Sequence, residues 1–452
     1  MERDLIEQLA AWKRSPFRKP LVLNGARQVG KTWLLREFGK REYRNYAYVT
    51  LEEIAPGVPS EYAQFFEMTK DPERIVSNLS LALGEPINPE ETLLILDEIQ
   101  DCPAAIGSLK YFCDNAPQYH VACAGSLLGV KVARGDSAFP VGKVEFLELG
   151  PMTFSEYLRA VGMENLDAYT QLIDGFNPVP HMFAMRLSEQ LQRYFITGGM
   201  PEPVNRWAVT QDIGQVDGVL ADLLASYERD FAKHGGARQF AKISLVWNSL
   251  PAQLARENKK FVWGVVREGA RAREYEDAVT WLSEAGLITV VRQNSAGGIP
   301  ISAYDSASSF KAYCLDVGLL RRLSQLDASA FAKTPALFAE FKGAFAENFV
   351  LQALEPQLDV TPRYWTNEKP RHEVDYLIQA GNTIVPVEVK SGEVVKSASL
   401  RYYASRRADM TPLRVRLSLK NLRLDDGVLN IPLYLAHRAV PLIRMALEKG
   451  VA

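Results

Sequence analysis

The stretch that decides the fold is Gly25-Ala26-Arg27-Gln28-Val29-Gly30-Lys31-Thr32, which fits the spacing G-x-x-x-x-G-K-[ST] without a deviation. The apolar run 21–24 (LVLN) precedes it and predicts a strand, and 33–38 (WLLREF) follows it with a helical pattern. A glycine-rich turn between a strand and a helix lets backbone N–H groups converge on an anion at the helix N-terminus. The stretch therefore predicts a loop that binds phosphate groups.

A second motif agrees with this loop. The apolar strand predicted over 92–96 ends in Asp97 and Glu98. We expect Lys31 to reach the β- and γ-phosphates of a nucleotide, and the Thr32 hydroxyl and Asp97 to hold Mg²⁺. Glu98 is then placed to polarise the attacking water. Together the two motifs predict an ATP site with Mg²⁺, in which Gly25, Ala26, Arg27, Gln28, Val29 and Gly30 complete the nucleotide-binding loop.

Ser126 follows another predicted strand, 120–124, by two residues. Its hydroxyl would sense the γ-phosphate from a position between the two motifs, or it is simply a serine in a turn. Both interpretations stay open from the sequence.

The first third of the chain alternates short apolar runs with helical patterns. Five strands are predicted, over 21–24, 46–49, 92–96, 120–124 and 145–149. Strands that alternate with helices indicate an α/β fold with a mostly parallel sheet covered on both faces. Residues 151–240 read as helical, and the last part opens with a helix over 338–354, followed by two strands around the turn at 380–382.

Length and composition exclude several protein classes. The 452 residues suggest about three domains. The balance of 52 basic and 54 acidic residues, with 47% hydrophobic ones, is that of an ordinary globular protein. No apolar run approaches the ~18–20 residues that span a bilayer, and the start lacks a signal-peptide pattern. Four cysteines without C-x-x-C spacing argue against a disulfide scaffold or a structural zinc site, so we expect a cytoplasmic protein without a membrane partner.

The near-neutral total hides an uneven charge distribution. Residues 45–105 hold 12 acidic and 2 basic side chains, whereas residues 396–423 hold 8 basic ones against Asp409. The basic stretch also contains Tyr402 and Tyr403, and a second basic group lies between 256 and 273. Both favour a nucleic-acid partner, DNA in the first instance, although a solvated surface would show the same pattern.

Three stretches resemble the bacterial AAA-type ATPases that carry the domain of unknown function DUF 4143: 25–32, 96–100 (LDEIQ) and 139–147 (FPVGKVEFL). The likeness continues through 198–202, 227–230, 281–287, 310–313 and 386–392. It implies an AAA core (1–165), a helical lid-like segment (166–240), a winged-helix-like region (241–325) and a restriction-endonuclease-like domain (326–452).

Two details of the resemblance concern single motifs. Gly198-Gly199-Met200-Pro201 resembles an element of STAND-like switch ATPases in which the proline lies near the adenine, but a helix end would also use these residues. Where related cores often show Gly-Arg, this chain has Gly142-Lys143, and lysine lacks the planar fork of an arginine finger. Arg134 is nearer in type, and hydrolysis that depends on a partner is an alternative.

A second candidate site lies near the C-terminus. Strand alternation places Glu373 and Asp375 on one face of their strand, and Glu388 and Lys390 on one face of the next. If the faces coincide, Asp375, Glu388 and Lys390 form the D…E-x-K set of restriction-type nucleases, where the carboxylates hold Mg²⁺ and the lysine helps to activate water. Glu347, on the preceding helix, would be a further acidic ligand. A hairpin with its polar face in water would show the same alternation.

The leading hypothesis is an ATP-hydrolysing AAA-type protein whose nucleotide state controls a C-terminal module that binds DNA and, in its stronger form, cleaves it with Mg²⁺. The alternative is a switch or scaffold that binds protein or nucleic acid without cleavage, and a motor that remodels proteins is a third. A homo-oligomer is compatible with all three.

Overall fold

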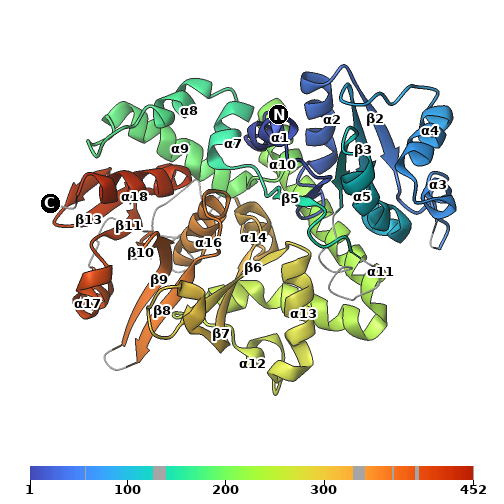
Figure 1. Ribbon diagram of the computed structural model, residues 1–452. Helices are drawn as coiled ribbons and strands as arrows, with labels where there is room; N and C mark the ends of the chain where they lie inside the picture. The colour runs from blue at the N-terminus through green and yellow to red at the C-terminus, as the bar shows by residue number, and fades with distance from the viewer. Residues whose placement is uncertain (56, 126–138, 329–341, 369–370, 392–396, 451–452) are drawn as a thin grey trace. The chain divides into compact units, whose positions relative to one another are not determined.

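The computed structural model describes residues 1–55, 57–125, 139–328, 342–368, 371–391 and 397–450 (Figure 1). It divides into two compact units. The N-terminal unit holds residues 2–150 together with 284–287, and the C-terminal unit holds residue 1, residues 151–283 and residues 288–452. Each unit is described by itself below.

The N-terminal unit is built on a five-stranded sheet in the order β2-β3-β4-β1-β5, with every neighbouring pair parallel. Its strands are β1 (Leu21–Asn24), β2 (Asn45–Thr50), β3 (Thr92–Asp97), β4 (His120–Ala124) and β5 (Glu145–Glu148). Its helices are α1 (Leu5–Arg14), α2 (Lys31–Glu42), α3 (Ala63–Met68), α4 (Pro72–Leu83), η1 (Ile99–Asp101) and α5 (Pro103–Asn115). The predicted parallel α/β sheet is confirmed.

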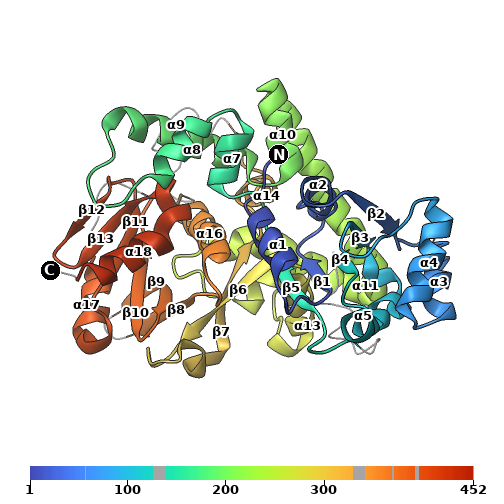
Figure 2. The same cartoon turned by 45° about the horizontal axis from the view of Figure 1, so that its top comes forward.

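Helices cover both faces of this sheet, as Figures 1 and 2 show. On one face α3, α4 and α5 pack through buried Phe66, Ile75 and Phe112 against strand residues that include Val22 and Leu94. On the other face α1 and α2 pack together, and their Trp12 and Phe38 rings lie 6.3 Å apart. Burial of apolar side chains on both faces explains why the strands read as continuous apolar runs in the sequence.

The C-terminal unit begins with helices, as predicted for residues 151–240. They are α7 (Phe154–Ala160), α8 (Glu164–Gln171), α9 (His181–Thr197), α10 (Pro201–Thr210), α11 (Ile213–Leu254), α12 (Trp263–Val266) and α13 (Ala272–Glu284). The later helices are η2 (Ile301–Tyr304), α14 (Val317–Leu323), α16 (Lys342–Leu354), η3 (Glu355–Gln357), α17 (Ala398–Arg406), η4 (Ala408–Met410), η5 (Leu433–Arg438) and α18 (Ala439–Glu448).

A mixed eight-stranded sheet, in the order β12-β13-β11-β10-β9-β8-β6-β7, forms the centre of this unit. Its strands are β6 (Ile288–Asn294), β7 (Asp305–Cys314), β8 (Arg363–Glu368), β9 (Arg371–Ala380), β10 (Thr383–Val389), β11 (Arg414–Ser418), β12 (Arg423–Asp425) and β13 (Val428–Pro432). The hairpin β6–β7 comes from the segment expected to be winged-helix-like, and β6 pairs with β8 through Gln293 and Tyr364. One sheet therefore spans both sides of the boundary expected near residue 325.

Gly198 and Gly199 join α9 to α10 where other chain segments come very close. A Cβ on Gly198 would lie 2.0 Å from Oδ1 of Asp316, and one on Gly199 would lie 2.2 Å from the carbonyl oxygen of Met152. The Gly199 N–H donates to Oδ2 of Asp316 at 2.6 Å. Packing within the C-terminal unit thus accounts for both glycines, in agreement with the helix-end interpretation of this motif.

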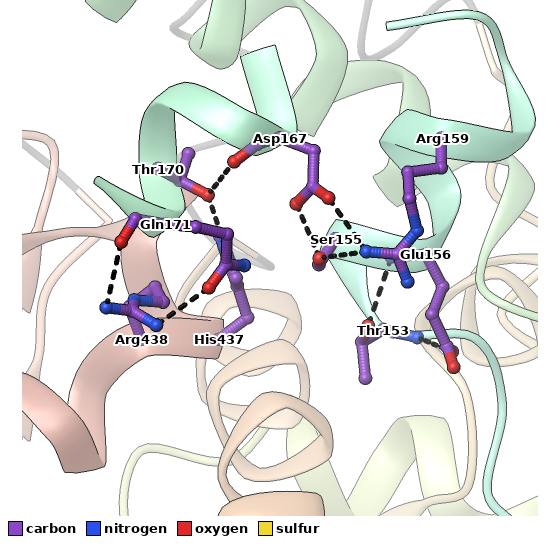
Figure 3. Close-up of polar contacts among 9 residues, drawn as sticks. All are labelled: Thr153, Ser155, Glu156, Arg159, Asp167, Thr170, Gln171, His437 and Arg438. Carbon is purple, nitrogen blue, oxygen red and sulfur yellow. Dashed lines mark hydrogen bonds and ion pairs between the residues drawn. The ribbon is translucent and has the colours of Figure 1, made fainter. Parts of the chain in front are cut away.

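Polar contacts tie α8, one of the first helices of the C-terminal unit, to η5 near its end (Figure 3). Thr170 Oγ1 lies 3.2 Å from Nε2 of His437, and the Arg438 guanidinium donates to the Gln171 side chain at 2.7 Å. Burial lowers the pKa of His437 to about 4, so its ring is neutral near pH 7. The α8 helix is therefore fixed to η5 by uncharged and charge-assisted hydrogen bonds.

The α7 helix in the same view is defined by a capping box. The Thr153 side chain accepts from the Glu156 N–H, and the Glu156 carboxylate accepts from the Thr153 N–H at 2.9 Å (Figure 3). Arg159 at its end donates to Asp167 of α8 at 2.7 Å.

Among the described residues, no helix is long and apolar enough to cross a membrane.

Candidate functional site

The glycine-rich loop joins β1 to α2 in a conformation that its glycines permit. Gly25 has φ of 142°, and a Cβ there would lie 2.1 Å from the carbonyl oxygen of Leu149. Gly30 has φ of 98° and forms the N-cap of α2. A side chain at Gly25 would clash and at Gly30 would be strained, which explains the glycines at these positions.

Lys31 is buried, with 7% of its surface exposed. Its ammonium group donates to the carbonyl oxygens of Gly25 and Ala26 at 2.8 Å each. Burial lowers the pKa of Lys31 to about 8, and the nearby Glu98 and Asp97 carboxylates oppose that effect. The lysine is therefore held against the glycine-rich loop, next to the place where the loop is expected to bind phosphate groups.

Thr32 and Asp97, the two residues expected to hold Mg²⁺, are in direct contact. The Thr32 hydroxyl donates to Oδ2 of Asp97 at 2.8 Å. Asp97 lies at the end of β3 and is buried, with 5% exposed. A hydroxyl and a carboxylate oxygen this close together suit the oxygen ligand set of Mg²⁺.

Tyr48, on β2, also contacts Asp97, and the sequence reasoning missed it. Its hydroxyl donates to the same Oδ2 at 2.8 Å, and the Arg36 guanidinium lies 3.7 Å from its ring centre. Burial, together with this bond, raises the pKa of Tyr48 to about 12. Tyr48 reaches Asp97 because β2 lies beside β3 in the sheet, and the sequence pattern of one strand does not reveal which strand is its neighbour.

Glu98 follows Asp97 in the left-handed backbone region, with φ of 50°. Its carboxylate accepts a hydrogen bond from the Gln100 side chain. Burial raises the pKa of Glu98. A glutamate with a raised pKa, held in a sparsely populated backbone conformation beside the buried Asp97, is suited to act as a general base.

Glu148 is a third carboxylate near the loop, after Asp97 and Glu98, and the sequence did not single it out. The register of β1 and β5 pairs Glu148 with Asn24, whose side-chain amide donates to Oε1 at 2.9 Å. Burial raises the pKa of Glu148, and its charge acts on Lys31. This contact fixes the strand end from which the glycine-rich loop starts.

Of three further residues singled out from the sequence, the structure describes one. Ser126 and Arg134 lie outside the described residues. Lys143 is described, and its ammonium group pairs with Asp114 at 2.6 Å on the surface. The structure therefore gives Lys143 a surface ion pair within the N-terminal unit.

The C-terminal candidate residues come together on the strands β9 and β10. These strands are antiparallel, and their regular pairing ends at Tyr376 opposite Val387. Just beyond this pair the Val389 N–H donates to Oδ2 of Asp375 at 2.8 Å. The pairing of β9 with β8 is irregular at the same place, between Val374 and Leu377. The Asp375 carboxylate also acts electrostatically on Lys390, so the side chains of the two strands lie near each other where the regular ladder ends.

Glu388 and Lys390 form an ion pair beside Asp375. The Lys390 ammonium group lies 2.8 Å from Oε1 of Glu388. The other oxygen, Oε2, is buried and has no hydrogen-bond partner among the described residues, and Glu388 as a whole is only 4% exposed. Burial and the Glu347 carboxylate raise the pKa of Asp375. An uncompensated buried carboxylate oxygen is costly, and it is also the group that a cation would stabilise.

Glu347, on α16, is engaged by side chains from the middle of the chain. Lys259 donates to Oε1 at 2.7 Å, and the Tyr313 hydroxyl donates to Oε2 at 3.0 Å. The ammonium group of Lys311 lies 3.9 Å from Oε2 and also pairs with Glu373. Burial alone would raise the pKa of Glu347, but the charges of Lys259 and Lys311 outweigh it and lower that pKa.

We call the group formed by Glu347, Glu373, Asp375, Glu388, Lys259, Lys311 and Lys390 the carboxylate–lysine cluster. Within the described parts of the chain, no group of three or more His, Cys, Asp and Glu side chains is arranged to hold a metal ion. Asp375 and Glu388 fit a cation through the unpartnered Glu388 oxygen, whereas both oxygens of Glu347 already accept from protein donors. Lys259 belongs to the basic group between 256 and 273, for which the sequence left DNA contact and a solvated surface open, and it lies in this cluster.

The basic stretch 396–423 is divided between two surfaces, and Lys396 lies outside the described residues. Arg401 and Arg406 are exposed on α17, where Tyr402 stacks on His372 with ring centres 4.2 Å apart. The other part borders a groove of about 610 Å³, lined among others by Arg416, Lys420, Asn421, Arg423, Asp425 and Asp426. Both surfaces mix basic groups with aromatic or acidic ones.

Comparison with known families assigns three segments of the chain. Residues 17–158 match a model described as an AAA domain, and residues 342–435 match the domain of unknown function DUF4143. Residues 188–330 match a further domain of unknown function, DUF8612. No curated protein matches the chain.

Several solved structures are similar over much of the chain. The Walker-type ATPase PABY2304 of Pyrococcus abyssi is 16% identical over 71% of this chain and 95% of its own, with a TM-score of 0.44. The ORC2 protein of Aeropyrum pernix is 13% identical over 76% and 94%, with a TM-score of 0.35. The RuvB Holliday junction branch migration motor of Thermotoga maritima is 12% identical over 64% and 89%, with a TM-score of 0.28. From the family matches, the chain carries an AAA-type P-loop domain in its N-terminal unit and a DUF4143 domain in its C-terminal unit.

Proposed function

We propose that the N-terminal unit binds ATP with Mg²⁺ and hydrolyses it. The observation that carries this proposal is the 2.8 Å hydrogen bond between Thr32 and Asp97, next to Glu98. It joins the end of the phosphate-binding loop to the end of β3, so that a magnesium ligand set and a general base lie side by side. Mg²⁺ would supply charge neutralisation at the β- and γ-phosphates.

Each residue then has one task. Lys31 exchanges the carbonyl oxygens of Gly25 and Ala26 for phosphate oxygens, which are stronger partners for an ammonium group because they are charged. Thr32 and Asp97 hold the metal, and Glu98 accepts a proton from the attacking water. The raised pKa of Glu98 strengthens it as a base as long as it remains ionised.

Calorimetric titration with ATP and Mg²⁺ tests the binding step. We expect Lys31→Ala to abolish binding, because the loop loses its charged phosphate contact. Lys40→Ala is the matched control, because Lys40 is an exposed lysine on the same helix. Equal affinities of the wild type and Lys31→Ala would contradict the proposed site.

For the C-terminal unit we propose nucleic-acid binding, with DNA as the first ligand to test and control by the nucleotide state of the ATPase. The observation in favour is that Asp375 and Glu388 lie on the neighbouring strands β9 and β10, and that α17, which carries exposed arginines, packs on these two strands. In the stronger form of this proposal, Asp375 and Glu388 hold Mg²⁺ and Lys390 helps to activate water for phosphodiester cleavage. This corresponds to a restriction-endonuclease-like centre.

Incubation of DNA with Mg²⁺ separates cleavage from binding. Cleavage by the wild type that Asp375→Asn abolishes would support the stronger form. Retarded migration of intact DNA, equal for both proteins, would support the alternative, a switch or scaffold that binds nucleic acid without cutting it. Loss of binding in Arg401→Ala with Arg406→Ala would assign the contact surface to α17.

A further inference from the structure

The carboxylate–lysine cluster includes two lysines that belong to none of the sequence motifs expected to carry chemistry at this centre. Lys311 comes from β7, and Lys259 comes from the loop 255–262 between α11 and α12. Lys311 is fully buried, whereas the Lys259 side chain is 13% exposed. Both ammonium groups act on the same carboxylate, Glu347. The middle of the chain thus contributes positive charge to a centre whose carboxylates come from α16, β9 and β10.

The charges of the cluster are nearly balanced without any metal. Four carboxylates face three ammonium groups, which leaves one formal negative charge if all are ionised. Lys259 and Lys311 both act electrostatically on Asp375 as well as on Glu347. A divalent cation placed at Asp375 and Glu388 would therefore be repelled by nearby ammonium groups in a water-poor environment, where such repulsion is strong.

Lys259 reaches the cluster from a loop that is attached at the lysine and after it. The Lys259 N–H donates to the Arg256 carbonyl at 3.3 Å. The Phe261 N–H donates to the Phe310 carbonyl at 2.8 Å, and Val262 bonds to Gln253. Lys259 itself has φ of 47°, a conformation that a lysine adopts rarely and that its surroundings must stabilise. The contact of its ammonium group with Glu347 at 2.7 Å supplies such stabilisation.

We propose that Lys259 determines whether Asp375 and Glu388 accept a divalent cation: its ammonium group occupies the cluster in place of the metal, and its withdrawal admits the metal. Glu347 serves in this scheme as the anchor of Lys259 and not as a metal ligand. The inference rests on the proposed role of Asp375 and Glu388 and adds the regulation of that site.

Titration of the full chain with Mn²⁺, followed by electron paramagnetic resonance without nucleotide, tests the inference. We expect Lys259→Gln to gain one Mn²⁺ that binds roughly tenfold or more tighter than any Asp375-dependent Mn²⁺ in the wild type. The double variant Lys259→Gln with Asp375→Asn should lose this ion. Lys260→Gln, which changes the exposed neighbouring lysine, and Lys259→Arg, which keeps the charge, should behave as the wild type.

Glu347→Gln provides a second and independent test. It removes the anchor of Lys259, so we expect it to gain Mn²⁺ affinity although it removes a carboxylate. A metal-binding role for Glu347 would have the opposite result, a loss of affinity. Circular dichroism on each variant shows that the fold is retained.

The outcomes separate this inference from the proposed cleavage. Gain of Asp375-dependent Mn²⁺ binding in Lys259→Gln, without DNA cleavage by any variant, would support the role of Lys259 and end the nuclease proposal. Equal Asp375-dependent Mn²⁺ affinity in the wild type and Lys259→Gln would overturn the role of Lys259, and DNA cleavage by that wild type would still support the nuclease proposal. If neither Lys259→Gln nor Glu347→Gln bound Mn²⁺, the proposed role of Lys259 would also be overturned.

Discussion

The hydroxyl of Thr32 donates to Oδ2 of Asp97 at 2.8 Å, and this bond joins the loop after β1 to the end of β3. The two strands are not neighbours, because β4 lies between them in the sheet. The carboxyl ends of parallel strands nevertheless meet at one edge, which is where open α/β sheets bind their ligands. The contact brings together the two oxygen atoms that we propose as ligands for Mg²⁺.

Removal of the Thr32 hydroxyl should weaken metal binding. We expect Thr32→Ala to raise the Mg²⁺ concentration needed for half-maximal ATP hydrolysis by about 10- to 100-fold. Thr32→Ser keeps the hydroxyl and should stay close to the wild type. The measurement is ATP turnover against Mg²⁺ at saturating ATP, and identical curves for Thr32→Ala and Thr32→Ser would refute the assignment.

Tyr48 should act on the metal through Asp97. Its hydroxyl fixes the orientation of the Asp97 carboxylate, so Tyr48→Phe should raise the half-maximal Mg²⁺ concentration by about tenfold. ATP affinity without Mg²⁺ should not change. Tyr46→Phe on the same strand is the matched control. A merely structural role of Tyr48 would lower the thermal stability without moving the Mg²⁺ curve.

ATP binding should take up a proton at alkaline pH. In the free protein burial lowers the pKa of Lys31 to about 8, so much of this lysine is neutral above that pH. Phosphate groups favour the ammonium form and raise the pKa again in the complex. Binding should therefore weaken as the pH rises above 8, with uptake of about one proton at pH 9 and none at pH 7. Calorimetry in buffers of different ionisation enthalpy counts these protons, and zero uptake at pH 9 would contradict the pKa of Lys31.

Loss of the buried ammonium group of Lys311 should destabilise the C-terminal unit. Lys311→Met leaves the buried Glu347 and the partly exposed Glu373 with less compensation, at a cost of about 3–5 kcal/mol in the free energy of unfolding. Arg423→Gln breaks an exposed pair with Asp425 and should cost less than about 1 kcal/mol.

Urea unfolding followed by tryptophan fluorescence measures both variants of the C-terminal unit. The signal comes mainly from this unit, because five of the seven tryptophans lie in it: Trp207, Trp247, Trp263, Trp281 and Trp365. Equal stability of Lys311→Met and Arg423→Gln would show that the Lys311 charge is not needed to compensate the buried carboxylates.

The sequence predicted the parts of the fold that local patterns determine. The strands β1, β3 and β4 of the N-terminal unit were predictable because they are buried nearly throughout and therefore form continuous apolar runs in the sequence. The glycine-rich loop was predictable because its spacing follows directly from the backbone geometry of phosphate binding.

Contacts between distant segments were not predictable in the same way. The pairing of β6 with β8 joins residues 288–294 to 363–368, and no local pattern reveals it. For the same reason Tyr48 and Lys259 were not recognised at their sites, since each reaches its carboxylate from a segment far away in sequence. Short amphipathic strands such as β11 and β12 also gave weak signals.

A single-turnover measurement with the wild-type protein and Glu98→Gln tests whether Glu98, beside Asp97, acts in the hydrolysis of ATP. Glutamine keeps the size of the side chain but cannot accept the proton of the attacking water. We expect Glu98→Gln to bind ATP and Mg²⁺ with unchanged affinity and to hydrolyse the bound ATP at least about 100-fold more slowly. Hydrolysis of bound ATP by Glu98→Gln at the rate of the wild type would contradict the account.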